Sequence, residues 1–240
     1  KYCCQKMNSS LAWLSAQTVE KAFGEPLRLE DFKDSYAVLG IDLSQTRDLT
    51  ACVCVIEKSG ELYVFAKFFL PSERIDEATE RDGIPYQAYI QSGILQASGD
   101  NFVDYHDCFE WCRSLVEDYK ILPLKVGYDR YSAAYLVQDM QADGFDMESV
   151  SQGSNLTGVI IDTEGMIKDG RLKSAEDNNL MKIHMMDSAL KYDETNRRRL
   201  VKVSRMAHID GMAALLGAMC MRRNYYNELE QLLRNERGNS

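Results

Sequence analysis

Three aspartates border apolar segments in a pattern that could bind metal ions. Asp42 ends the apolar run of YAVLGIDLS, Asp129 ends LKVGYD, and Asp210 opens HIDGMAALLGAM. A carboxylate beside apolar residues is costly unless it is paired or binds a cation, so three of them predict a common partner. Because hard oxygen ligands select Mg²⁺ or Mn²⁺, a pair of divalent ions is the simplest partner.

The chemistry expected of such a site is hydrolysis of a phosphodiester. Two ions about 3.5–4 Å apart can activate a water and stabilise the leaving oxygen. Strand ends are where α/β sheets bind ligands, so Asp42, Asp129 and Asp210 are predicted to be both the catalytic residues and the metal ligands. Each also has a structural alternative: Asp210 as a helix cap, Asp129 as a helix start and Asp42 as a turn residue.

The first half of the chain predicts the strand that carries Asp42. YAVLGIDLS, LTACVCVIE and ELYVFAKFFL indicate an antiparallel meander of three strands, with a turn at residues 58–60. Pro71 ends the third strand, and IPYQAYIQSG predicts a short helix within a long excursion over the sheet. Residues 1–35 show no strand pattern, and we interpret them as a linker or hinge.

The second half alternates helix and strand. Apolar residues recur at helical spacing over 105–119, Pro123 is predicted to separate this helix from the strand LKVGYD, and a helix over 131–143 precedes the strand FDMESVSQ. This order predicts a mixed α/β sheet whose later strands run parallel and are covered by helices on both faces. Further helices are predicted over 156–168, over 175–186 and from Asp210 onward, and SALKYD with RLVKVSR predicts a hairpin.

The net charge of −9 argues against a protein whose whole surface wraps nucleic acid. The predicted hairpin is nevertheless locally basic, with Arg197, Arg198, Arg199 and Lys202 as candidate contacts to a DNA backbone. An alternative is that these charges only discourage edge-to-edge aggregation.

Seven cysteines, an odd number, fall mostly in apolar patterns rather than at zinc-ligand spacings, which favours a reducing, cytosolic compartment. No apolar run reaches the length of a membrane span, so no membrane partner is expected. Because the chain starts at Lys1 rather than at Met, we expect it to be a piece of a longer protein.

Three motifs carry a resemblance to a known family. GIDLSQTRDLTA looks like the first nuclease motif, VGYDRY like the second and HIDGMAALLGA like the last motif of the C-terminal nuclease domain of tailed-phage terminase large subunits, the DNA-packaging motors. The resemblance covers about residues 36–222, and the segment NSSLAWLS is similar to the link from that family's ATPase domain.

The resemblance implies a ribonuclease H-like fold over 36–240, preceded at 1–35 by a remnant of the link to a missing N-terminal ATPase domain. It implies an endonuclease that cuts concatemeric viral DNA when packaging starts and ends, with Asp42, Asp129 and Asp210 binding two Mg²⁺ or Mn²⁺ ions. The implied partners are double-stranded DNA, the ATPase domain, the terminase small subunit and the portal, in the host cytoplasm. The isolated domain is expected to be monomeric. No G-x-x-x-x-G-K-[ST] loop occurs, so we expect no ATP hydrolysis by that route.

Two alternatives use the same residues. GIDLSQTRDLTACV also resembles the phosphate-binding hairpin of actin-like and sugar-kinase-like domains, although Ser44 stands where that hairpin normally has glycine. The second alternative is another nuclease of the same fold, such as a junction resolvase or a transposase. Such a protein would usually have a glutamate as its last catalytic carboxylate, where this chain has Asp210, or would carry a more basic surface.

Overall fold

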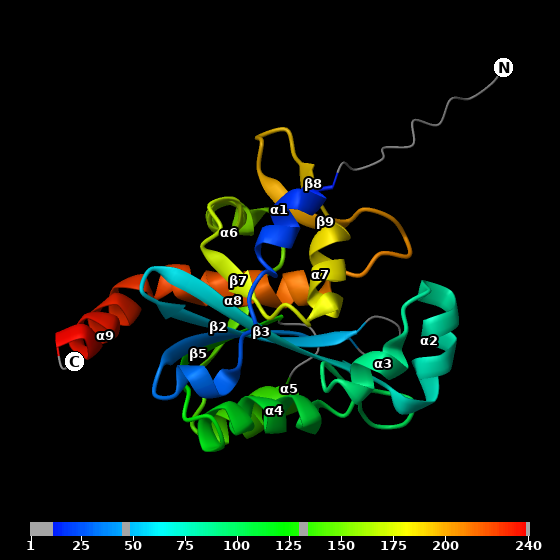
Figure 1. Cartoon of the computed structure of the whole chain (residues 1–240), viewed down its shortest axis with the longest axis horizontal. Helices are drawn as coiled ribbons and strands as arrows, with labels where there is room; N and C mark the ends of the chain where they lie inside the picture. Colours follow the sequence, from blue (N-terminus) through cyan, green and yellow to red (C-terminus); the bar gives the residue numbers. More distant parts are fainter. Residues whose placement is uncertain (1–11, 45–48, 130–133, 239–240) are drawn as a thin grey trace.

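The computed structural model describes residues 12–44, 49–129 and 134–238. Within these ranges a mixed sheet lies between two layers of helices, and a separate two-stranded hairpin stands above one layer (Figure 1). Residues 1–11 of the predicted linker and residues 131–133 of the helix predicted over 131–143 lie outside the described residues.

The antiparallel half of the sheet is the predicted meander. It consists of β1 (Tyr36–Asp42), β2 (Thr50–Lys58) and β3 (Glu61–Leu70). Asp42 pairs with Ala51, and Ala51 pairs with Phe68 on the next strand, so these residues form one row across the sheet. Ser59 and Gly60 both have positive φ, 55° and 81°, which suits the tight turn between β2 and β3.

The other half of the sheet is parallel, as predicted. β5 (Leu122–Asp129) pairs parallel with β1, and β6 (Met147–Val150) pairs parallel with β5. The strand order is β4-β3-β2-β1-β5-β6, and β7 (Leu172–Ser174) also pairs with β3. β4 (Leu95–Ala97) and β7 were not predicted, because three residues are too few to show a strand period.

The prediction that Pro123 separates a helix from the next strand was wrong. β5 begins at Leu122 and includes Pro123, which pairs with Ala37. The register between the strands then shifts, so that Val38 pairs with Lys125. Proline has no N–H to donate to the ladder, and the strand accommodates it at this irregular position.

Helices cover both faces of the sheet (Figure 1). On one face lie α4 (Tyr105–Glu117) and α5 (Ala134–Ala142), and on the other lie α8 (Asp210–Asn224), α6 (Thr157–Lys168), α7 (Asn179–Met186) and α1 (Ala16–Lys21). α7 starts later than predicted because β7 ends at Ser174, and the Asn178 side chain then caps the helix by accepting from the Met181 N–H. The chain ends in α9 (Tyr226–Gly238).

The excursion after β3 contains α2 (Ile75–Asp82) and α3 (Tyr86–Gln91), the second of which was predicted. The predicted hairpin is also present, as β8 (Ser188–Tyr192) and β9 (Arg198–Lys202). No helix within the described ranges combines the length and apolar character that crossing a bilayer requires.

The described part of the lead-in is packed into the domain. Trp13, Leu14, Val19 and Phe23 are buried in the core that α6, α7 and α8 share with the sheet. The Trp13 N–H also donates to the Ser188 carbonyl at 2.8 Å, which ties this segment to the start of β8. The domain boundary at residue 35 stays a prediction, but residues 12–23 contribute to the core of this fold.

Backbone contact at glycine fixes α8 on the sheet. A Cβ added at Gly40 on β1 would lie 1.9 Å from the Ala214 carbonyl oxygen, and one added at Gly127 on β5 would lie 2.7 Å from the Gly217 carbonyl oxygen. Helix and strands therefore approach so closely that only glycine fits at both strand positions.

We expect Gly40→Ala to destabilise the domain by about 3 kcal/mol, at the upper end of overpacking effects, because the added methyl meets backbone rather than a movable side chain. Urea unfolding measures the change. The control is Gly165→Ala in the interior of α6, where a Cβ would meet nothing within 4 Å and helix propensity predicts a gain of about 0.5–1 kcal/mol. Equal stability of the two variants would contradict the close contact.

We expect Phe23→Ala to cost about 3–5 kcal/mol of unfolding free energy, because the ring is buried against the core. The matched control is Phe102→Ala, whose ring is 61% exposed and whose loss should change stability by less than about 0.5 kcal/mol. The comparison is made by chemical denaturation. A small effect at Phe23 would mean that the lead-in is only a linker.

Candidate functional site

Asp42 and Asp129 lie side by side at one end of the sheet. β1 and β5 are parallel neighbours, with Ile41 paired to Tyr128, so the residue after each lies in the same row. Gly40 and Gly127 face α8, and side chains alternate along a strand, so Asp42 and Asp129 also face the side of the sheet that α8 covers. Sequence reasoning placed both at strand ends, and the strands end there.

Asp210 is the first residue of α8, and that helix begins at the same end of the sheet. Gly211 lies against Phe68, which belongs to the row that contains Asp42. At the far end of the helix, Arg222 makes a two-point ion pair with Glu57, with both nitrogen–oxygen distances 2.9 Å. α8 therefore runs antiparallel to β1, with its N-terminus at the carboxylate end.

The oblique path of α8 separates Asp210 from the other two carboxylates. The helix lies over Phe68 on β3 near its start, over Gly40 on β1 at its middle and over Gly127 on β5 beyond it. Among the described residues, no three or more His, Cys, Asp or Glu side chains are grouped so as to hold one metal ion. The fold brings the three aspartates to one end of one face, but it does not assemble them as a finished metal site.

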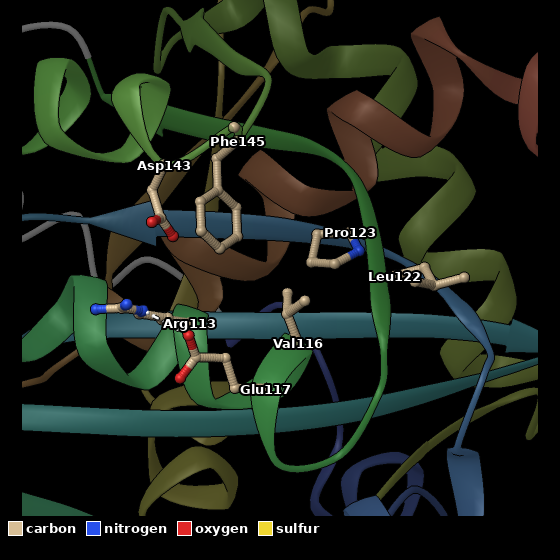
Figure 2. A pocket seen from close by; sticks show the side chains of 8 residues that line it. Arg113, Val116, Glu117, Leu122, Pro123, Asp143 and Phe145 are labelled. Carbon is tan, nitrogen blue, oxygen red and sulfur yellow. Dashed lines mark hydrogen bonds and ion pairs between the residues drawn. The ribbon is translucent and has the colours of Figure 1, made fainter.

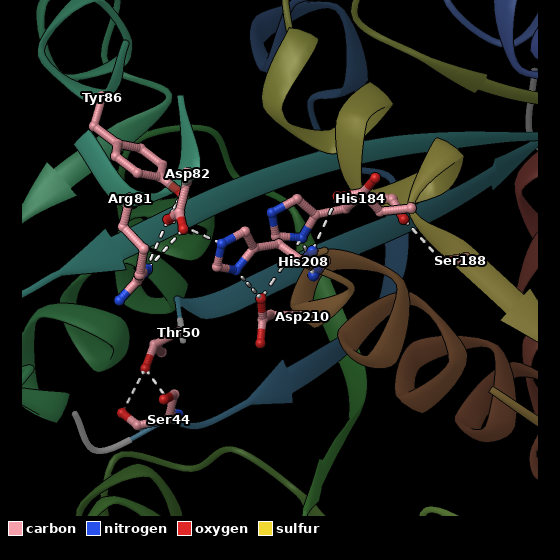
Figure 3. Close-up of polar contacts among 11 residues, drawn as sticks. Ser44, Thr50, Arg81, Asp82, Tyr86, His184, Ser188, His208 and Asp210 are labelled. Atoms are coloured by element: carbon pink, nitrogen blue, oxygen red, sulfur yellow. Dashed lines mark hydrogen bonds and ion pairs between the residues drawn. The ribbon is translucent and has the colours of Figure 1, made fainter. Parts of the chain in front are cut away.

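The surroundings of Asp42 are held by neighbouring loops. The Gln152 side chain, which follows β6, donates from Nε2 to Oδ1 of Asp42 at 3.0 Å. Beyond Asp42, the Ser44 N–H donates to the Thr50 hydroxyl, which donates back to the Ser44 carbonyl, both at 3.1 Å. The chain leaving the first carboxylate is thereby fixed to the start of β2 (Figure 3).

Two imidazoles face the buried carboxylate of Asp210, which is 5% exposed as a residue. Oδ2 of Asp210 lies 3.9 Å from Nδ1 of His184 and 3.7 Å from Nδ1 of His208. Burial lowers the pKa of His184 well below its ordinary value, and its Nδ1 accepts the Gly211 N–H at 2.9 Å, so this ring is neutral. His184 is therefore a hydrogen-bond acceptor for the start of α8.

The pKa of His208 shifts in the opposite direction to that of His184. Burial lowers its pKa, but contact with Asp210 and the charge of Asp82 outweigh burial, and the pKa is raised overall. Its Nε2 lies 2.9 Å from Oδ2 of Asp82, a side chain that is only 1% exposed. Sequence reasoning missed Asp82, and only its place beside the predicted helix of the excursion could have drawn attention to it.

The four basic residues predicted to contact DNA do not act as one group. Arg198 is engaged by Glu164 of α6 at 2.7 Å, whereas Arg197 and Arg199 line a cavity of about 440 Å³ with Lys191 and Gln152. Lys202, at the end of β9, is not among the residues that line it. Because Gln152 also bonds Asp42, this basic groove adjoins the carboxylate end of the sheet.

A cavity of about 420 Å³ lies elsewhere, between the end of α4 and the segment after α5 (Figure 2). Its lining includes Arg113, Glu117, Pro123, Asp143 and Phe145. It opens near the first residues of β5, whereas Asp129 is the last residue of that strand. This cavity is therefore separate from the candidate site.

Comparison with known proteins identifies the family. Residues 1–225 match the family described as the terminase large subunit, endonuclease domain. A curated relative, the terminase large subunit of Enterobacteria phage HK97, is 27% identical over 180 residues, which are 73% of this chain and 35% of the relative. The chain thus spans about a third of the length of that relative.

Solved structures show the same fold. The HK97 large terminase superposes with a TM-score of 0.76 at 22% identity, covering 87% of this chain and 43% of that one. The large terminase nuclease of thermophilic phage G20c with bound magnesium has a TM-score of 0.57 at 12% identity, covering 88% of this chain and 98% of that one. The mixed sheet with helices on both faces is accordingly ribonuclease H-like, as predicted, and the chain belongs to the endonuclease-domain family of terminase large subunits.

Proposed function

We propose that this chain is a metal-dependent DNA endonuclease in which Asp42, Asp129 and Asp210 bind two divalent ions. The observation that carries the proposal is that two neighbouring parallel strands end in carboxylates on one face, at the end of the sheet where α8 begins with a third. Membership of an endonuclease family agrees with this arrangement.

The chemistry of the donors suits Mg²⁺ or Mn²⁺, because all three groups offer hard carboxylate oxygens. The G20c nuclease has been solved with bound magnesium and with bound cobalt, which supports a divalent ion in this fold. Bound ions would supply a Lewis acid and lower the pKa of a coordinated water. We propose that the three carboxylates form a complete site only with ions bound, because among the described residues they are not grouped around one metal position.

The protein's own residues prepare these carboxylates. Gln152 restrains one oxygen of Asp42, and the Ser44–Thr50 pair fixes the chain that follows. The dipole of α8 favours a negative charge at Asp210 in its first turn. These contacts orient the ligands before a metal or DNA arrives, so less ordering is left for the catalytic step.

We propose that the groove beside Gln152 binds the DNA backbone through Lys191, Arg197 and Arg199. Lys191 and Arg199 are directly opposite each other on the hairpin, and both are exposed. Like charges in that position repel, and an anion between them would relieve the repulsion. Phosphate contact of this kind positions DNA without reading its sequence.

In the whole protein, the proposed role is to cut concatemeric viral DNA at the start and end of packaging. The proposed partners are double-stranded DNA, an N-terminal ATPase domain, the small subunit and the portal, in the host cytoplasm, with the isolated domain monomeric. The finding that the chain matches about a third of the HK97 subunit supports the expectation of further domains. No observation favours the nucleotide-binding or resolvase alternatives over the family that matches.

We expect nicking of supercoiled plasmid by this chain with Mn²⁺ or Mg²⁺ and none with EDTA. Asp129→Asn should reduce the rate by more than about 100-fold, because loss of a ligand exceeds the 10–100-fold effect of an outer-shell partner. The matched control is Asp118→Asn, an exposed carboxylate at the end of α4 that should leave the rate unchanged. Cutting by a folded Asp129→Asn variant at the wild-type rate would exclude the proposed site.

We expect Arg199→Ala to weaken binding to duplex DNA and to reduce the slope of log affinity against log salt by about 0.9, as loss of one phosphate contact predicts. Fluorescence anisotropy in EDTA measures binding without cleavage. Arg198→Ala is the control on the adjacent residue, and it should have the smaller effect because Glu164 already engages that guanidinium. A larger effect at Arg198 would contradict binding in the proposed groove and would indicate that DNA contacts the other side of the hairpin.

A further inference from the structure

A buried carboxylate outside the three predicted aspartates is connected to Asp210. Asp82 is the last residue of α2, and Gly83 follows in the left-handed region with φ 67° to end the helix. The Asp82 side chain is 1% exposed. A charge buried to this degree is costly unless it is paired and hydrogen-bonded, so its contacts need an explanation.

Asp82 is held from three sides (Figure 3). Arg81 donates to both of its oxygens, at 2.7 and 2.8 Å, and the Tyr86 hydroxyl donates to Oδ2 at 3.0 Å. The third contact is Nε2 of His208 at 2.9 Å. Burial raises the pKa of Asp82, but Arg81, His208 and Tyr86 outweigh burial and lower it, so the group is a carboxylate.

His208 joins this carboxylate to the candidate site. Its other ring nitrogen, Nδ1, lies 3.7 Å from Oδ2 of Asp210. The backbone N–H of His208 donates to Asp187 at the end of α7, at 3.0 Å, and its ring stacks on His184 with the centroids 6.0 Å apart. The charged groups around the ring are thus Asp82 and Asp210, with Lys202 acting over a longer range.

We propose that Asp82 is a positioning residue for the nuclease site: it holds the imidazole of His208, and His208 holds the carboxylate of Asp210 in the orientation from which it binds metal. This inference rests on the proposed function. Partners that orient a ligating carboxylate contribute to metal affinity although they do not touch the metal.

The proposal explains why the excursion between β3 and α4 packs as it does. α2 ends at Asp82, and the buried Tyr86 at the start of α3 bonds the same carboxylate, so both helices converge on one group. The excursion in this way supplies a contact to His208, which lies 126 positions after Asp82 in the chain. A purely structural role for Asp82 would not require its partner to face Asp210.

The test is Mn²⁺ binding by Asp82→Asn, measured by isothermal titration calorimetry on the full 240-residue chain. We expect the dissociation constant to rise by about 10–100-fold. The KM for plasmid DNA should change little, because Asp82 is absent from the basic groove. Nicking should recover as Mn²⁺ is increased, which is the signature of a site that is misoriented rather than missing.

A matched control separates positioning from stability. Glu57→Gln breaks the ion pair with Arg222, whose side chains are 11% and 10% exposed, at the opposite end of α8. It should lower the melting temperature without changing Mn²⁺ affinity. If Asp82→Asn does not fold, Tyr86→Phe removes only the hydroxyl that bonds Asp82, and a several-fold loss of Mn²⁺ affinity is expected.

Mn²⁺ binding by the Asp82 or Tyr86 variant that is as tight as in the wild type, or tighter, overturns the positioning role. Equal Mn²⁺ affinity of the wild type and the Asp210→Asn variant overturns both this inference and the proposed metal site. Asp210-dependent binding in the wild type, weakened at Asp82 and unchanged at Glu57, supports both.

Discussion

The close approach of α8 to β1 and β5 is the constraint on which the site depends. Gly40 and Gly127 allow the helix backbone to touch the strands, and each is followed two residues later by an aspartate, as Gly-Ile-Asp and Gly-Tyr-Asp. Because side chains alternate, the strand face that presents glycine to the helix presents a carboxylate just beyond it. The helix itself begins with the third carboxylate. One packing contact therefore sets the relative positions of all three.

Buried charge at this end of the sheet is balanced by a second layer of contacts. The carboxylate of Asp210 faces two imidazoles, one neutral and one paired with Asp82, which in turn is paired with Arg81. Removing one member would leave another buried charge without compensation, and such losses are large. The start of α8 is thus bonded through His184 on the side of β3, while Gln152 bonds Asp42 on the side of β6.

Much of this arrangement was predictable from the sequence because it is local. Apolar runs with a turn between them indicated β1 to β3, helical spacing indicated α4, and the order of elements indicated that β5 and β6 run parallel. The position of Asp210 in the first turn of a helix followed from the apolar run after it. The row that joins Asp42 to Asp129 then follows from the parallel pairing.

The remainder depends on contacts between distant segments. No period in the sequence indicates that Asp82 meets His208, that Glu164 engages Arg198, or that the lead-in packs against α7 and the hairpin. The strands β4 and β7 are too short to show alternation, and Pro123 enters a strand because the partner's register shifts around it. These features are decided by tertiary packing, which single-sequence patterns do not record.

The acidic character of the chain is compatible with the DNA binding that we propose for the basic groove, because electrostatic interactions in salt are short-ranged. At physiological ionic strength the Debye length is about 8 Å, so acidic groups on distant surfaces are largely screened from a phosphate in the groove. The electrostatic potential at a phosphate in the groove is set by Lys191, Arg197 and Arg199. Asp193, which also lines the groove, offsets part of it. A net charge of −9 still weakens attraction to a polyanion at long range, so the proposed DNA contact depends on the basic residues of the groove itself. The groove can therefore attract a phosphate at short range although the net charge of the chain repels DNA at long range.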